Sequence, residues 1–229
     1  MELSPRTLAR LSDAAGLLVD LDGTLVDSEP LHRQAYRDYF AARGWDVPDD
    51  VVREFAGRRA VEVFPVLDGP WAGEDPDALT EGVLDVLARA TARPEAVAGA
   101  AELLQACVRA EVPVCVVTSA RLSWALPALD LLGVPHGAVR LVTAEDCTHG
   151  KPDPEPFRRG AQALGLPPTA LVALEDSPAG IVSARDAGVG LVLGVRTSQP
   201  DEVLLAAGAD ATCGDLTALA PAVEARVGR

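Results

Sequence analysis

The sequence predicts an α/β protein: a Rossmann-like, doubly wound parallel sheet into which a small helical domain is inserted. Short apolar runs bounded by Gly, Pro or Asp alternate with amphipathic stretches, as expected for buried strands joined by helices. One long segment, from Ser28 to about Pro94, interrupts this alternation with helical patterns alone. The chain of 229 residues is long enough for one large domain with such an insert.

Five apolar runs are candidate strands, because each is short and rich in Leu and β-branched residues. They cover 16–21, 113–118, 139–143, 171–175 and 189–195. Their continuous apolar character, without alternating polar residues, predicts strands that are covered on both faces. In a parallel sheet of this kind, the residues that follow the strands meet at one edge and form the functional site.

Amphipathic stretches between these runs are the candidate helices of the core. They cover 98–110, 122–132, 154–164 and 178–187. The clearest helix start is Ser177-Pro178, where Ser suits the capping position and Pro the first helical position.

The inserted segment reads as helical because residues 31–42 and 78–92 carry apolar side chains at three- and four-residue spacing. Between them, 64–76 contains three Pro and two Gly and is predicted to be a loop. The insert is too long for an ordinary crossover between strands. We therefore expect a core domain at 1–27 and 95–229 and a helical cap domain at 28–94.

Composition excludes several classes of protein. Acids outnumber bases 34 to 20, and the formal net charge of −14 argues against nucleic-acid binding. No run approaches the ~20 apolar residues of a membrane span, so no membrane association is expected. The four cysteines lack C-x-x-C spacing, which favours a reduced, cytoplasmic protein. Nothing in the sequence indicates an obligate protein partner.

Four carboxylates gather where the predicted strands end. Asp20 and Asp22 follow the first run, and Glu175 and Asp176 lie at the end of the fourth. Four like charges at one edge repel each other unless a cation lies among them. Lys151, the single lysine of the chain, follows the third run and supplies one positive charge. Oxygen ligands without His or Cys suit Mg²⁺, so a magnesium site is expected here.

The residue types at the first strand end suit phosphoryl transfer. An Asp at position 20 can form an aspartyl-phosphate, and Asp22, on the same side of the strand, can act as general acid and base. Taken alone, each segment also has a simpler interpretation. The segment D-x-D-G-T is compatible with a polar turn, and Glu175-Asp176-Ser177 with the capping of a helix.

Four segments together resemble the four motifs of the haloacid dehalogenase superfamily. They are DLDGT at 20–24, VVTS at 116–119, GKPDPEPF at 150–157 and LEDSPAGI at 174–181. The resemblance extends from about Leu17 to Asp215, and the helical insert resembles the C1-type cap of that superfamily. It implies a haloacid dehalogenase-like α/β core with a helical C1 cap and Mg²⁺ as the cofactor.

The resemblance also implies roles for individual residues. Asp20 resembles the nucleophile that accepts the phosphoryl group. Asp22 resembles the acid/base, and its backbone carbonyl would bind Mg²⁺. Thr118, with Ser119 beside it, resembles the hydroxyl that binds a phosphate oxygen. Lys151 resembles the lysine that lies beside the nucleophile and the phosphate.

In the fourth motif, Asp176 resembles a metal ligand, and Glu175 a second ligand or an acid behind it.

Asp22 indicates phosphoryl transfer, because dehalogenase members of the superfamily lack an acid at this place. The cap contains no lysine, which excludes the Schiff-base chemistry of the phosphonatases. We expect a phosphatase acting on small phosphate monoesters of sugars, polyols or similar metabolites. A phosphosugar mutase of the β-phosphoglucomutase type and a catalytically silent sensor of a phosphorylated ligand are the alternatives.

The segment 116–157 most resembles the glycerol-3-phosphate and 2-deoxyglucose-6-phosphate phosphatases. His32 falls where the mutases place a His against the acid/base, although a solvent-facing helix start is equally compatible with it. Arg59 resembles the Arg that reaches from cap to phosphate in the sugar and polyol phosphatases. Trp71 belongs either to the cap core or to a stacking site for a ligand ring. Oligomeric state stays open, as do the roles of Arg58, Arg121 and His149.

Overall fold

The computed structural model describes residues 3–135 and 137–226, and within them six parallel strands form the main sheet. The strand order is β5-β4-β1-β6-β7-β8. The strands are β1 (Gly16–Val19), β4 (Val114–Val117), β5 (Arg140–Val142), β6 (Leu171–Glu175), β7 (Leu191–Val195) and β8 (Ala211–Cys213). The sheet confirms the predicted fold class. Five strands coincide with predicted runs, whereas β8 was not predicted.

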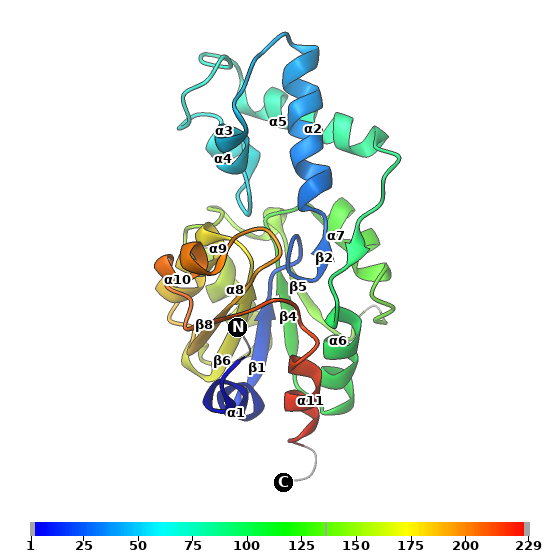
Figure 1. Cartoon of the computed structure of the whole chain (residues 1–229), viewed down its shortest axis with the longest axis vertical. Coiled ribbons are helices and arrows are strands. Elements are labelled where there is room, and N and C mark those ends of the chain that lie inside the picture. The colour runs from blue at the N-terminus through cyan, green and yellow to red at the C-terminus, as the bar shows by residue number, and fades with distance from the viewer. Residues whose placement is uncertain (1–2, 136, 227–229) are drawn as a thin grey trace.

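Helices cover both faces of this sheet (Figure 1). Leu17 and Val19 of β1 belong to one apolar cluster, and Leu18 belongs to a second. Successive side chains of a strand point to opposite faces of the sheet, so the two clusters lie on opposite faces. The first cluster includes α1 (Pro5–Asp13), α6 (Ala100–Arg109), α7 (Leu122–Asp130) and α11 (Leu219–Glu224). The second includes α8 (Glu155–Leu164), α9 (Pro178–Asp186) and α10 (Asp201–Ala206). In the part of the chain described, no helix is long and apolar enough to cross a membrane.

A helical cap lies beyond the carboxyl ends of the strands (Figure 1). It contains α2 (Glu29–Ala42), α3 (Asp49–Arg53), α4 (Ala60–Val63) and α5 (Pro76–Arg89). Two short antiparallel strands, β2 (Val26–Asp27) and β3 (Glu95–Ala96), carry the chain into and out of this cap. The boundaries of 28–94 for the cap and of 1–27 with 95–229 for the core stay a prediction. Residues 1–2, 136 and 227–229 of that core lie outside the described residues.

The cap has an apolar core of its own, built largely from aromatic rings. Trp71 is 2% exposed, and its ring stacks on Phe40 with the centroids 5.2 Å apart. The indole Nε1 of Trp71 donates hydrogen bonds to the carbonyl oxygens of Phe64, at 3.1 Å, and Leu67, at 3.0 Å. Both the ring and the N–H group are therefore used inside the cap. Of the two roles considered for Trp71, the structure assigns it to the cap core.

Candidate active site

The structure brings the predicted site together at the carboxyl ends of β1, β4 and β6, which are neighbours in the sheet. Asp20 follows β1, Thr118 follows β4, and Glu175 ends β6. From β1 the chain continues to β4 and β5 on one side, and then crosses to β6, β7 and β8 on the other. This is the switch point of a doubly wound sheet, where such folds bind their ligands.

Lys151 lies among the carboxylates of this edge. Its Nζ donates to Oδ1 of Asp20 at 2.5 Å and to the carbonyl oxygen of Val117 at 3.0 Å, and it also contacts Oε1 of Glu175. The residue is 1% exposed. Burial opposes the charged ammonium, but Asp20 and Glu175 outweigh burial and raise the pKa of Lys151. Lys151 is therefore a permanent positive charge at the end of the sheet.

Asp20, Glu175 and Asp176 bring one carboxylate oxygen each to within 4.8 Å of one another. Glu175 has both oxygens occupied, Oε1 by Lys151 and Oε2 by the backbone N, at 3.1 Å, and the hydroxyl, at 2.9 Å, of Ser177. Oδ1 of Asp176, by contrast, is buried without a hydrogen-bond partner among the described residues. An open carboxylate oxygen beside Asp20 fits a divalent metal ion, with Glu175 held behind it by Lys151 and Ser177.

The protonation of these acids supports the same interpretation. Burial and the carboxylates of Glu175 and Asp22 raise the pKa of Asp20 to about 8, although Lys151 lowers it. Burial, together with Asp20 and Glu175, also raises the pKa of Asp176. A cation bound between the two carboxylates would favour their ionised forms.

Two glycines of the predicted motifs let the backbone approach the carboxylates. Gly23 has φ +83°, and a Cβ there would lie 2.0 Å from Oδ2 of Asp176. A Cβ at Gly180 would lie 1.8 Å from Oε1 of Glu175. Any larger residue would displace an acid from its position, so glycine at both places is a steric requirement of the site.

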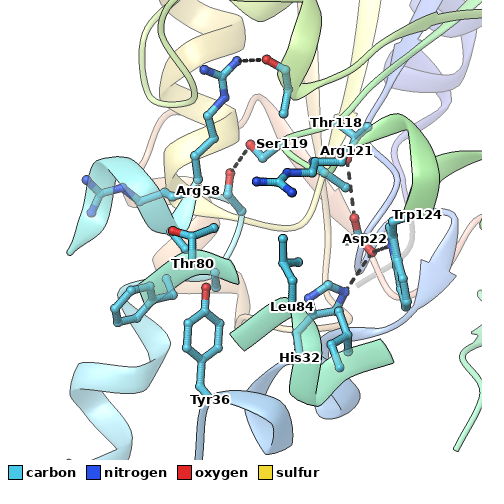
Figure 2. A pocket seen from close by; sticks show the side chains of 18 of the residues that line it. Asp22, His32, Tyr36, Arg58, Thr80, Leu84, Thr118, Ser119, Arg121 and Trp124 are labelled. Carbon is cyan, nitrogen blue, oxygen red and sulfur yellow. Dashed lines mark hydrogen bonds and ion pairs between the residues drawn. The ribbon is translucent and has the colours of Figure 1, made fainter. Parts of the chain in front are cut away.

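Asp22 lies outside the cluster of Asp20, Glu175 and Asp176, and Figure 2 shows His32, Thr118 and Trp124 around its side chain. Ser28 Oγ, at 2.6 Å, and Trp124 Nε1, at 2.8 Å, donate to Oδ1, while Thr118 Oγ1 lies 3.4 Å from Oδ2. His32 Nε2 lies 3.3 Å from Oδ1. Burial raises the pKa of Asp22, but His32, Ser28 and Trp124 reverse the effect and lower it. His32 thus lies against Asp22, as the mutase resemblance implies, whereas Ser28 and Trp124 were not predicted.

A cavity of about 690 Å³ lies between the core and the cap, within the range typical of small-molecule sites. Asp20 and Asp22 line it from the core. Figure 2 shows Tyr36, Thr80 and Leu84 of the cap facing the core across this space. The cavity therefore joins the predicted reacting groups to a wall of cap residues that would contact the rest of a substrate.

Two further predicted residues connect the cap to the core. Arg59 lines the cavity, but its Nη2 donates to the carbonyl oxygens of Ala144, at 2.8 Å, and Cys147, at 3.0 Å, in a core loop. Ser119 Oγ donates to the carbonyl oxygen of Gly57 at 2.9 Å (Figure 2). Phosphate binding by Arg59 and Ser119 stays a prediction, and the structure shows that each also links the two parts of the chain.

Arg121 and His149, whose roles were open, are paired with acids. Arg121 lines the cavity, and its Nη2 lies 2.5 Å from Oε1 of Glu81 on α5. His149 is largely exposed, with Nδ1 3.6 Å from Oε2 of Glu155. The carboxylate of Glu81 offsets the charge of Arg121, which disfavours a second phosphate site there.

Comparison with known proteins settles the family. Residues 15–188 match the family model of the haloacid dehalogenase-like hydrolases. The chain belongs to this family. This hydrolase is 39% identical over 202 residues to validoxylamine A 7′-phosphate phosphatase of Streptomyces hygroscopicus subsp. limoneus, covering 87% of this chain and 93% of that protein. It is 34% identical over 177 residues to hexitol phosphatase A of Escherichia coli, covering 77% and 81%.

Solved structures confirm the fold of this hydrolase. A crystal structure of a hydrolase from Pseudomonas syringae matches with a TM-score of 0.81 at 24% identity, covering 92% of this chain and 98% of the other. The family match and the relatives named as phosphatases confirm the expected class of enzyme, a phosphoric monoester hydrolase.

Proposed function

We propose that this hydrolase is a Mg²⁺-dependent phosphatase that cleaves small phosphate monoesters of sugars, polyols or similar metabolites through an aspartyl-phosphate on Asp20. The observation that carries the proposal is the contact of Lys151 Nζ with Asp20 at 2.5 Å, next to the open Oδ1 of Asp176. Relatives named for a hexitol and for fructose 1-phosphate, the latter 31% identical, support the substrate class.

Lys151 and the hydroxyl of Thr118 would hold oxygens of the bound phosphoryl group. The ammonium offsets the repulsion between the Asp20 carboxylate and a phosphate dianion, and it stabilises charge on the equatorial oxygens in the transition state. Asp20 and Asp176, with the backbone carbonyl of Asp22, are the proposed Mg²⁺ ligands. When bound, Mg²⁺ would neutralise carboxylate charge and polarise the phosphoryl oxygens.

In the first step a carboxylate oxygen of Asp20 attacks phosphorus in line, and the bond from phosphorus to the alcohol oxygen breaks. Asp22 delivers a proton to the departing alkoxide. His32 is the adjacent proton carrier. Burial lowers its pKa, but contact with Asp22 outweighs burial, so the pKa of His32 lies above its usual value. In the second step Asp22 takes a proton from water, whose oxygen attacks the phosphoaspartate. Phosphate leaves and Asp20 is regenerated.

The direct test is phosphate release from a panel of sugar and polyol phosphates in the presence of Mg²⁺. We expect turnover by the wild type, none by Asp20→Asn, and a large loss in Asp22→Asn. Full activity of Asp20→Asn would rule out the aspartyl-phosphate mechanism. Circular dichroism of both variants controls for folding.

Two other functions are distinguished by simple assays. A mutase would form glucose 6-phosphate from β-glucose 1-phosphate with a bisphosphate primer. The pairing of Arg121 with Glu81 supports hydrolysis over this alternative. A silent sensor would bind a phosphorylated ligand tightly without turnover on the whole panel. The intact set of reacting groups disfavours the sensor.

The proposed location is the cytoplasm. Cys107, Cys115, Cys147 and Cys213 are all free thiols, which suits a reducing compartment. Fractionation of the cells that produce the protein, followed by immunodetection, tests this location.

A further inference from the structure

The cap residue Glu62 binds the backbone of the core immediately before Lys151. Its Oε1 and Oε2 lie 2.9 and 3.1 Å from the backbone N of Gly150. A Cβ at Gly150 would lie 2.8 Å from Cδ of Arg59 and 2.9 Å from Oε2 of Glu62. The cap thus packs directly on the peptide that carries Lys151, and a side chain at 150 would have to displace Arg59 and Glu62.

Arg59 strengthens the same contact. Its Nη1 lies 3.1 Å from Oε1 of Glu62, while Nη2 donates to the carbonyl oxygens of Ala144 and Cys147. The side chain of Arg59 is 10% exposed, so water screens this ion pair less than it would at the open surface. Two adjacent cap side chains therefore bind both an N–H group and carbonyl groups of one core loop.

The core holds the neighbouring N–H groups of this loop without help from the cap. Glu155 of α8 accepts hydrogen bonds from the backbone N of Thr148, at 3.0 Å, and of His149, at 2.8 Å. The N–H group of Gly150 is bound by Glu62 instead. Opening of the cap would leave 148 and 149 fixed by Glu155 and would release Gly150, the residue directly before Lys151.

We propose that Glu62 is a positioning residue: in the closed enzyme it fixes the Gly150 peptide, and so completes from the cap the placement of Lys151 that the core contacts begin. The chemical consequence rests on the role of Lys151 in the proposed function, whereas the loop contact itself does not. This arrangement would link enclosure of the substrate to completion of the catalytic group, as lid closure does in other enzymes.

The first test measures kcat and KM for p-nitrophenyl phosphate, whose leaving group needs no proton and is foreign to the cap. Glu62→Ala is expected to lower kcat about 10- to 100-fold, because small displacements of a reacting group have effects of this size. Glu62→Gln should regain much of that loss, since its amide oxygen still accepts from Gly150. The matched control is Glu74→Ala, which removes another cap acid paired with an arginine, Arg43, at the exposed surface.

The second test uses NMR to measure the rate of amide hydrogen exchange at Gly150. Glu62→Ala should speed exchange at Gly150 about tenfold or more, because the N–H group loses its bond, while Thr148 and His149 keep their protection. Glu74→Ala should leave all three unchanged. Unfolding of the cap would instead raise exchange throughout α2 and α5, which separates local release from general destabilisation.

Unchanged kcat in Glu62→Ala overturns the positioning role, whatever happens to the exchange rate. A change confined to KM overturns it as well, because that result describes substrate binding by the cap. If the wild type turns over neither p-nitrophenyl phosphate nor any sugar phosphate, the proposed function fails. The inference about Glu62 then depends on Gly150 exchange alone, and unaltered exchange refutes it.

Discussion

Lys151 Nζ and Asp20 Oδ1 lie 2.5 Å apart, and both residues are almost fully buried, 1% and 4% exposed. The chain uses arginine nineteen times and lysine once, and the single lysine occupies this position. A compact ammonium contacts Asp20, Glu175 and a backbone carbonyl at once, and the planar fork of a guanidinium cannot take that geometry in the same space.

Lys151→Arg is therefore expected to lose most activity while the fold survives. The charge is kept, so Asp20 and Glu175 still face a cation, but the larger group overpacks the site at a cost of about 1–3 kcal/mol in stability. We expect kcat to fall by roughly 100-fold or more, because a preorganised charge is displaced. Steady-state kinetics and circular dichroism test this together. Wild-type turnover by the variant would contradict the role assigned to Lys151.

Removal of metal should make stability depend on pH in a defined direction. Asp20, with a pKa raised to about 8, and Asp176, whose pKa is also raised, bind protons more tightly folded than unfolded. The metal-free protein should therefore lose stability as pH rises from about 4 to 8. Bound Mg²⁺ opposes that loss, so it should raise Tm more at pH 8 than at pH 5. Thermal unfolding with EDTA or Mg²⁺ checks this, and equal increments at both pH values would be inconsistent with it.

Gly23→Ala should weaken metal binding through a steric effect. The added Cβ would lie 2.0 Å from Oδ2 of Asp176, and the backbone φ of +83° adds strain of about 1–3 kcal/mol. Isothermal titration should show Mg²⁺ affinity reduced by roughly 10-fold or more. Gly44→Ala is the matched control, because Gly44 also has a positive φ, +70°, but has no atom within 4 Å of an added Cβ among the described residues. Equal effects of the two variants on Mg²⁺ affinity would rule out the steric explanation.

Trp71→Ala should destabilise the cap and leave the substrate preference unchanged. Removal of a ring that is 2% exposed typically costs about 3–5 kcal/mol. Trp71→Phe should cost less, because the packing on Phe40 is retained while the two hydrogen bonds of the indole are lost. Urea denaturation measures both. Unchanged stability combined with an altered substrate preference would show that Trp71 faces the ligand.

Much of the core could be predicted because strands covered on both faces need uninterrupted apolar sequence, as 171–175 illustrates. The strand β8, Ala211–Cys213, escaped prediction because three residues of Ala, Thr and Cys at a sheet edge carry no such signal. The strands β2 and β3 have two residues each, and their pairing depends on contacts between parts of the chain far apart in sequence.

The proposed reacting groups could be found in the sequence because Asp20, Lys151 and Asp176 follow strand ends, where parallel sheets collect polar side chains. The support of these groups was harder to predict. Trp124 donates a hydrogen bond to Asp22, which lies 102 residues away in the sequence. Glu62 accepts one from Gly150, which lies 88 residues away. Both contacts depend on how helices pack against the sheet edge. A possible signal for Trp124 was its place in the first turn of the helix that follows Thr118.

The pairing of Val26 with Ala96 and of Asp27 with Glu95 places the two crossings between core and cap side by side. The chain of the insert therefore enters and leaves through one narrow neck, and the strands of this neck form a sheet separate from the six parallel strands. A replacement insert has to supply equivalents of Glu62, which accepts from Gly150, and of His32, which lies against Asp22. Chimeras joined at 27 and 95 are the natural route to enzymes of new selectivity on this scaffold.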